Sequence, residues 1–361
     1  MSRPLQYKSI NNTVIASSSS LITTSQPSVT NISNGMPVGD MEIYEMYLRA
    51  YGNLDITSSA AGTIVANGPE NFLRSITFQT DKHGKLIDSL DGRGLYVINQ
   101  YRTGTSGQRT AISAATTGTP SFETNLILPF ATPSGLRPYD SILDVLKARP
   151  TLITQYGVVA DFISGGTNSV LDVGNLSQEL DARILNGPIV EPSAAQGAPL
   201  AETPEWMPHI EMFRYTVAAS ATGLRIPLPY GDRIYRRIYI SQRNSSTFAE
   251  VSNIVASTAN VGIEVNSFPW GDRVQNATLQ AANKQNFQAE TLPTGWTVLD
   301  FDETNRYADM LSVIDRNNGT ANLIIDVTTQ TNAQLWVYLE SFKPIPDAAL
   351  RDSQLALRSA A

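Results

Sequence analysis

Short runs in which apolar and polar residues alternate recur along most of this chain. In the first half, Tyr44, Met46 and Leu48 alternate with Ile43, Glu45, Tyr47 and Arg49, in a run that can extend to Ile56. Alternation with a period of two is typical of strands that bury one face. Because Gly, Pro, Ser and Asn separate many such runs, the pattern predicts an all-β sandwich or barrel.

A proline-rich stretch at residues 187–208 divides these runs into two sets. Prolines lack the N–H that a sheet interior requires, so this stretch is predicted to be a linker. Strand-like runs before it are Ser75–Thr80, Phe122–Phe130, Thr151–Ile163 and Gln178–Leu185. Runs after it are Ile210–Ala219, Leu224–Leu228, Arg233–Gln242, Ile254–Val265, Trp296–Phe301, Met310–Ile314, Leu323–Thr328 and Leu335–Phe342. With 361 residues, two domains are the natural expectation.

One principal helix is predicted in each half, at Asp88–Tyr101 and at Trp270–Phe287. A shorter helix is expected at Asp140–Ala148, before Pro150. Asn318-Gly319 predicts a tight hairpin. The two halves share an order of strands, one helix and further strands, which indicates a duplicated fold.

The segment Gly68–Gly104 is the best defined local unit. It reads as a turn, a strand, a second turn at Asp81–Gly84 and the first helix. Gly84 is expected to adopt positive φ in that second turn. His83 lies in the same turn, where a solvated role is expected.

Both ends of the chain differ from the predicted sandwiches. Residues 1–40 are rich in Ser, Thr and Asn, and they read as an arm of extended segments. Residues 344–361 contain good helix formers and are predicted to form a helical tail. The start of the chain lacks the apolar core of a signal peptide, and no apolar run approaches the length of a membrane span.

Composition argues against several classes of function. The formal net charge is −7 and the pI is near 5.0, whereas nucleic-acid binding requires clustered cations. The absence of cysteine excludes disulfides, thiolate metal sites and cysteine nucleophiles. Charged residues make up only 16% of the chain, which suits a protein that packs against copies of itself, although it also suits adhesins.

No catalytic grouping is recognisable. His83 and His209 are the two histidines of the chain, too few and too far apart to predict a zinc site. Asp300 and Asp302 lie near a predicted strand end, where carboxylates are more often solvated or turn-forming than catalytic. We predict no enzyme activity, no cofactor and no metal.

Five arginines are the candidate functional residues. Strand alternation places Arg236 on one face with Ile234 and Ile238, and Arg237 on the other with Tyr235 and Tyr239. This split disfavours a stacking platform for single-stranded nucleic acid. Bidentate contacts with carboxylates of neighbouring subunits are favoured instead. The candidate inter-subunit contacts are Arg225, Arg233, Arg236, Arg237 and Arg243.

The segment Gly68–Tyr101 resembles the major capsid proteins of tailless icosahedral phages, the tectivirus-like double jelly-roll family. The likeness lies in the Gly-Pro-x-Asn opening, the pair Phe72-Leu73, Arg74, the strand, the polar turn and the helix ending in Val97-Ile98-Asn99. Weaker likeness occurs at Asn125–Phe130 and Leu335–Phe342. About a third of the chain is covered, and no counterpart exists for the linker or the arginine-rich segment.

The resemblance implies two tandem jelly-roll β-sandwiches with one short helix inserted in each. The predicted boundaries are an N-terminal arm at 1–40, a first jelly roll at 41–186, a linker at 187–208, a second jelly roll at 209–343 and a tail at 344–361. Three chains would form a pseudo-hexameric capsomer of an icosahedral virion, after synthesis in the host cytoplasm. Neighbouring capsomers, minor capsid and vertex proteins, and an internal membrane contacted by terminal arms are the implied partners. The alternative is a trimeric receptor-binding or spike/adhesin β-module.

Overall fold

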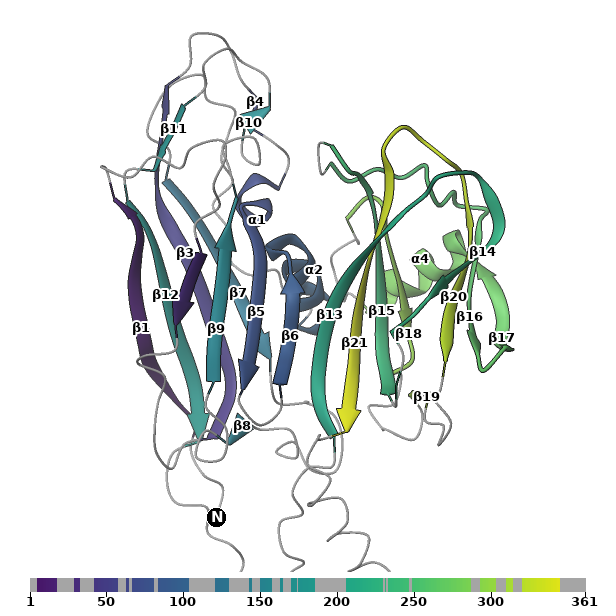
Figure 1. Ribbon diagram of the computed structural model, residues 1–361, viewed down its shortest axis with the longest axis horizontal. Helices are drawn as coiled ribbons and strands as arrows, with labels where there is room; N and C mark the ends of the chain where they lie inside the picture. The colour runs from purple at the N-terminus through teal and green to yellow at the C-terminus, as the bar shows by residue number, and fades with distance from the viewer. Residues whose placement is uncertain are drawn as a thin grey trace, which may run out of the picture.

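A computed structural model shows two β-sandwiches side by side (Figure 1). It describes residues 5–17, 29–32, 42–57, 63–64, 67–80, 84–103, 121–129, 143–144, 150–157, 163–164, 170–173, 175–185, 206–229, 231, 233–246, 249–286, 293–302, 310–313 and 320–344. Within these residues, no helix combines the length and the apolar character needed to cross a membrane.

The first sandwich is built from the first half of the chain. One of its sheets has the order β1-β12-β3, with β7, β8 and β11 also paired to β3. The other contains β2-β9-β5-β6. The bounds are β1 Leu5–Ser17, β2 Val29–Ile32, β3 Glu42–Thr57, β5 Leu73–Thr80, β6 Gly84–Leu90, β7 Ser121–Pro129, β8 Leu143–Asp144, β9 Pro150–Tyr156, β11 Val170–Val173 and β12 Asn175–Leu185. A two-residue pair joins β4 Thr63–Ile64 to β10 Ile163–Ser164, and α1 spans Gly68–Asn71.

The second sandwich repeats this strand order. One sheet is β13-β21-β15-β18, with β19 also paired to β15, and the other is β14-β20-β16-β17. The bounds are β13 Trp206–Thr216, β14 Ala221–Pro227, β15 Arg233–Asn244, β16 Asn260–Val265, β17 Phe268–Gln275, β18 Trp296–Asp300, β19 Leu311–Val313, β20 Ala321–Val327 and β21 Ala333–Pro344. In chain order, β1, β2, β3, β5, β6, β7, β9 and β12 correspond to β13, β14, β15, β16, β17, β18, β20 and β21.

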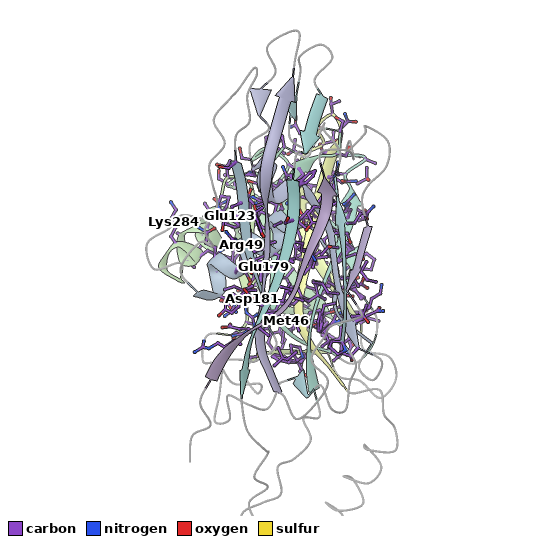
Figure 2. All side chains as sticks on the ribbon, turned by 90° about the vertical axis from the view of Figure 1, so that its left-hand side faces the viewer. Met46, Arg49, Glu123, Glu179, Asp181 and Lys284 are labelled. Carbon is purple, nitrogen blue, oxygen red and sulfur yellow. The ribbon has the colours of Figure 1, made fainter. Side chains whose placement is uncertain are left out.

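The helices occupy equivalent places in the two repeats. The helix α2 (Gly92–Thr103) follows β6, and α4 (Asn276–Asn286) follows β17. The duplicated plan expected from the sequence is therefore confirmed strand by strand, and both helices lie on the same side of the molecule (Figure 2). The expected all-β class with two jelly rolls and one helix in each is also confirmed.

A single nine-stranded sheet runs through both sandwiches. Its halves meet where β6 pairs in parallel with β13, with Ile210 opposite Ile87 and Glu211 opposite Asp88. One apolar core fills the first sandwich and extends across the junction to Trp296, Trp336 and Tyr338. A second core lies between the two sheets of the second sandwich. The two repeats are therefore packed into one body.

Several local expectations are wrong. The segment Trp270–Phe287 begins as strand β17, and its helix starts only at Asn276. Residues 84–90 form β6, so the predicted helix at Asp88 begins at Gly92. The helix predicted at Asp140–Ala148 contains strand residues Leu143–Asp144, and its other residues lie outside the described chain.

The hairpin expected at Asn318-Gly319 lies outside the described residues. The described strands before and after it, β19 and β20, belong to different sheets and do not pair with each other. Gly84 does adopt a φ of 66°, as expected. His83 and the predicted tail after Pro344 lie outside the described residues.

The extended segments of residues 1–40 belong to the first sandwich. The strand β1 pairs with β12 along its whole length, and β2 pairs with β9. These pairings integrate both segments into sheets, so they do not form a separate arm. The other domain boundaries remain predictions.

Candidate functional site: the junction between the sandwiches

The helix α2 lies between the two sandwiches and touches both (Figure 1). Its residues from Gly92 to Tyr101 are all buried, as expected for a helix covered on every side. Gly94 lets it approach closely, because a Cβ there would lie 2.1 Å from Tyr338 Cε1 on β21. The backbone of α2 therefore rests directly on the second sandwich.

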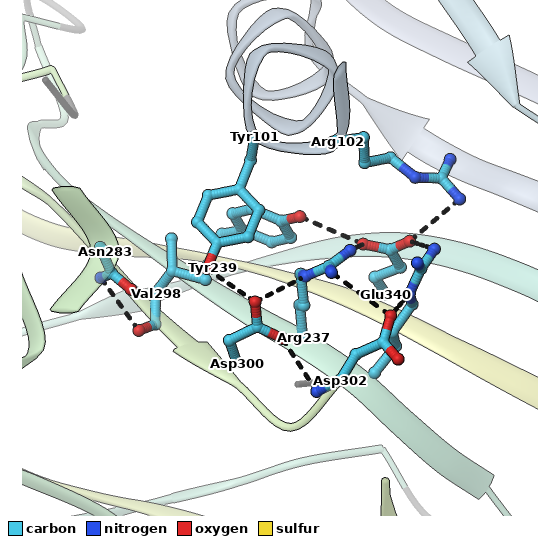
Figure 3. Close-up of polar contacts among 10 residues, drawn as sticks. Tyr101, Arg102, Arg237, Tyr239, Asn283, Val298, Asp300, Asp302 and Glu340 are labelled. Carbon is cyan, nitrogen blue, oxygen red and sulfur yellow. Dashed lines mark hydrogen bonds and ion pairs between the residues drawn. The ribbon is translucent and has the colours of Figure 1, made fainter. Parts of the chain in front are cut away.

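The last turn of α2 ends in a buried cluster of charges (Figure 3). Arg102 Nη2 lies 3.2 Å from Glu340 Oε1 on β21, and Tyr101 donates a hydrogen bond of 2.7 Å to Asp300 at the end of β18. The strand β15 supplies the remaining cations. Three arginines face three carboxylates: Arg102, Arg236 and Arg237 against Asp300, Asp302 and Glu340.

Glu340 is the central acceptor of this cluster. Arg236 Nη1 lies 3.0 Å from its Oε1, and the Tyr239 hydroxyl donates to its Oε2 at 3.1 Å. Burial alone would raise the pKa of Glu340, but the charges of Arg102, Arg236 and Arg237 outweigh burial and lower it to about 2. The carboxylate is therefore held ionised inside the protein.

A second buried cluster holds the first turn of α2. Arg93 makes a bidentate pair with Glu250, with Nε–Oε1 at 2.7 Å and Nη2–Oε2 at 3.1 Å. Arg243 Nη1 lies 3.0 Å from Asp91 Oδ2, and the Tyr338 hydroxyl donates to Asp91 Oδ1 at 2.7 Å. Both ends of α2 are thus tied to the second sandwich through charge-assisted bonds.

A third group lies where β6 and β13 meet. His209 is buried, and its Nδ1 lies 2.7 Å from the Lys85 carbonyl oxygen. Glu211 on the same strand pairs with Arg233 and lies 3.2 Å from His209 Nε2. Burial alone would raise the pKa of Glu211. The opposite effect of His209, Arg233 and Lys343 is larger, and the pKa falls to about 2.

All five predicted contact arginines have a carboxylate partner within the chain. Arg233, Arg236, Arg237 and Arg243 are all buried, and carboxylates of the same chain pair with all four. They stabilise the junction, which corrects the expectation that they project toward a neighbouring subunit. Arg225 differs, because its side chain is 68% exposed beside Glu264, and its inter-subunit role remains a prediction.

A β-bulge explains why strand alternation misassigned β15. The register with β21 shifts between Tyr235 and Arg237. As a result Tyr235 shares the second core with Ile238, while Tyr239 faces the first core. Both Arg236 and Arg237 then reach the same carboxylates.

Sequence reasoning missed the acidic half of both clusters. Glu340 was recognisable as the only charged residue in the apolar run Leu335–Phe342. A charge in such a run is rarely buried without a partner. Asp300 and Asp302, considered above as a carboxylate pair, lie against arginines. Asp91, Arg93 and Glu250 carried no comparable local signal.

The same strand order occurs in both sandwiches, which share one sheet, and this arrangement defines a double jelly-roll protein. No protein-family model and no curated protein matches this sequence. Solved structures do match. The STIV major capsid protein shares 15% identity at a TM-score of 0.69, covering 95% of this chain and 97% of its own.

Two further structures have the same fold. The major capsid protein P2 of bacteriophage PM2 has a TM-score of 0.58 and 13% identity, covering 96% of this chain and 99% of its own. The Faustovirus major capsid protein has a TM-score of 0.56 and 7% identity, covering 96% of this chain and 91% of its own. This chain therefore has the double jelly-roll fold of those proteins over nearly its whole length.

The pair between Arg93 and Glu250 is expected to couple strongly. Arg93→Met, Glu250→Gln and the double variant form a double-mutant cycle, and the predicted coupling is about 2 kcal/mol because both groups are buried and hydrogen-bonded. Urea unfolding of the four proteins measures it. The exposed pair Lys85–Asp88 is the control cycle, with an expected coupling below about 1 kcal/mol. Equal coupling energies in the two cycles would contradict the idea that Arg93 holds the first turn of α2 to the second sandwich.

The junction is also expected to weaken in acid. Because the pKa of Glu340 falls from 4.5 to about 2, its ionised form stabilises the folded state fully above pH 4.5. That contribution, about 3 kcal/mol, is lost as pH falls from 4.5 toward 2. Unfolding free energies measured between pH 6 and pH 2 should decrease accordingly, and less steeply in Glu340→Gln. Parallel pH profiles for the two proteins would disprove this assignment.

Proposed function

We propose that this chain is the major capsid protein of a tailless icosahedral virus. Three copies would associate into a pseudo-hexameric capsomer, and capsomers would tile the shell. The observation that carries the proposal is the fusion of two sandwiches of identical strand order into one body. Three such chains present six similar units, so a threefold assembly can fill a site of nearly sixfold shape.

The buried clusters around α2 support a structural role. A shell subunit must keep its two sandwiches at one fixed angle, and ion pairs at both ends of a buried helix provide that constraint. The proposed partners are other copies of the chain, minor capsid and vertex proteins, and an internal membrane reached by the terminal segments. The protein would be made in the host cytoplasm and reside in the virion, with no catalytic role.

Particle composition tests this function. Electron microscopy and mass spectrometry of particles from the native source should show tailless icosahedral shells with this chain as their most abundant protein. Native mass measurement of the purified chain should give a trimer. Confinement of the chain to vertices or spikes would instead support the receptor-binding alternative and overturn the proposal.

A further inference from the structure

The outer face of the six-stranded sheet carries an ion cluster centred on Arg49 (Figure 2). Arg49 on β3 lies opposite Glu179 on β12, with Nη1–Oε2 at 3.2 Å. Its Nε also lies 2.9 Å from Glu123 Oε1 on β7. Tyr51, two residues further along β3, has its ring centroid 4.4 Å from the Arg49 guanidinium carbon. A strand arginine is thus held between carboxylates of both neighbouring strands.

The same arrangement occurs in the second sandwich on the equivalent strands. Arg237 on β15 lies opposite Glu340 on β21 and opposite Asp300 on β18, and it pairs with both carboxylates. Tyr239 follows two residues later. The strands β15, β21 and β18 correspond to β3, β12 and β7, so the cluster belongs to the repeat.

The two clusters differ in solvent exposure, because among the described residues a helix packs over only one of them. The side chains of Arg237 and Glu340 are 10% and 5% exposed, whereas those of Arg49 and Glu179 are 41% and 25% exposed. The helix α2 contributes Arg102, which pairs with Glu340 on the second sandwich. Within the chain, the Arg49 cluster has no equivalent helix among the described residues.

The helix α4 is the counterpart of α2 in the repeat. Each helix has one basic residue in its last turn, Arg102 in α2 and Lys284 in α4. Neither helix has an acidic residue in its first turn. While α2 is buried on all sides, α4 exposes Ala277, Ala281 and Lys284. Beside α4, strand β17 carries the exposed side chains of Phe268 and Trp270, which are 74% and 50% accessible.

Charge on the two surfaces is complementary. Among the side chains that the structure describes, the outer face of the six-stranded sheet carries four carboxylates and two arginines, a net charge of −2: Glu45, Glu123, Glu179, Asp181, Arg49 and Arg183. The opposing surface, α4 and β17, carries Lys284, Arg273 and Asp272, a net charge of +1. The sheet with four carboxylates therefore favours an approaching lysine.

We propose that α4 and β17 of one copy dock on β12, β3 and β7 of a second copy, with Lys284 pairing with Glu179 of the second copy as Arg102 pairs with Glu340 within the chain. This inference rests on the proposed capsid function. The contact repeats between copies the relation that joins the two sandwiches within one copy. Because different surfaces meet, it is heterologous and can close three copies into a ring.

The docking also covers both ends of the molecule. The strands β1 and β17 are edge strands at opposite ends of the chain's sheets (Figure 1). Exposed sheet edges favour uncontrolled association, and natural proteins cover or blunt them. Pro269 has no N–H to donate at its position in β17, and the exposed side chains of Phe268 and Trp270 on either side of it offer apolar surface for the contact.

Cross-linking of the cysteine-free chain tests the contact. A chain carrying both Lys284→Cys and Glu179→Cys is treated with a short bismaleimide, because the Cα atoms of a lysine–glutamate pair lie too far apart for a disulfide. Denaturing electrophoresis should then show covalent dimers and trimers. Each single variant should remain monomeric under the same treatment.

A matched control places the first cysteine on another exposed surface of the second sandwich. Gln330→Cys with Glu179→Cys should give no ladder, because Gln330 lies in the turn before β21. A ladder in the control equal to that of the test pair would overturn the proposal. If native mass measurement shows a trimer but positions 284 and 179 do not cross-link, the docking proposal is wrong and the proposed capsomer still stands. A chain that stays monomeric at high concentration would overturn both the docking and the capsomer.

A charge reversal provides an independent readout. Lys284→Glu should weaken trimer association at least about tenfold in sedimentation experiments, because it places like charges together. The melting temperature of the monomer should stay unchanged, since Lys284 is exposed. Unaltered association would contradict the proposed pair.

Discussion

Replacing Glu340 with glutamine is expected to destabilise the folded chain by about 3–5 kcal/mol, since it leaves buried arginines without their main counter-charge. Arg102, Arg236 and Arg237 all lie within 3.6 Å of the Glu340 carboxylate. The glutamine keeps the shape and can still accept a hydrogen bond from Tyr239, so packing changes little. Urea denaturation followed by tryptophan fluorescence measures the loss, because Trp296 and Trp336 lie in the core that crosses the junction.

The matched control for this variant is Glu123→Gln. Glu123 also pairs with a strand arginine, Arg49, but both side chains are at least 30% exposed. Exposed pairs contribute about 0–1 kcal/mol, so this variant should unfold almost as the parent does. A similar small loss for Glu340→Gln would mean that the junction cluster does not hold the two sandwiches together.

The overall strand order was largely predictable because it depends on local patterns. Alternation identified β3, β5, β7 and β12, and nearly every strand of the second sandwich. A strand that buries one face shows its period directly in the sequence. The strand β6 was missed because Asp88 and Ser89 suggested a helix cap. The strand β17 was missed because it is exposed at almost every residue, so no alternation marks it.

The junction was less predictable because its partners are far apart in the sequence. Arg93 and Glu250 are 157 residues apart, and Tyr338 and Asp91 are 247 apart. No local period relates such pairs. The bulge in β15 added a second obstacle, because a register shift changes which face each arginine occupies. The sequence therefore indicated that these arginines pair with carboxylates, but it suggested partners on neighbouring subunits. The carboxylates that pair with Arg233, Arg236, Arg237 and Arg243 belong to the same chain.

Gly94→Ala is expected to cause a loss of several kcal/mol and to disturb the angle between the sandwiches. The new Cβ would lie 2.1 Å from Cε1 and 2.6 Å from Cζ of Tyr338, and 2.7 Å from Asp91 Oδ1. The Tyr338 ring is fully buried and stacks on Trp296 at 5.3 Å, so it cannot move aside without disturbing the core. Small-angle scattering and urea unfolding should show altered domain packing and lower stability.

A second glycine separates this clash from the general effect of adding a methyl group. Gly84 has a φ of 66°, and a Cβ added there would have no atom within 4 Å, so Gly84→Ala meets backbone strain of about 1 kcal/mol and no steric conflict. Alanine normally stabilises a helix relative to glycine by about 1 kcal/mol, which would favour Gly94→Ala if α2 had room. A stabilised Gly94→Ala protein would show that α2 does not rest on Tyr338. A loss larger than that of Gly84→Ala would show that close contact of α2 with β21 sets the packing of the two sandwiches. Weaker association of the proposed trimer in Gly94→Ala would show that the proposed capsomer depends on that packing.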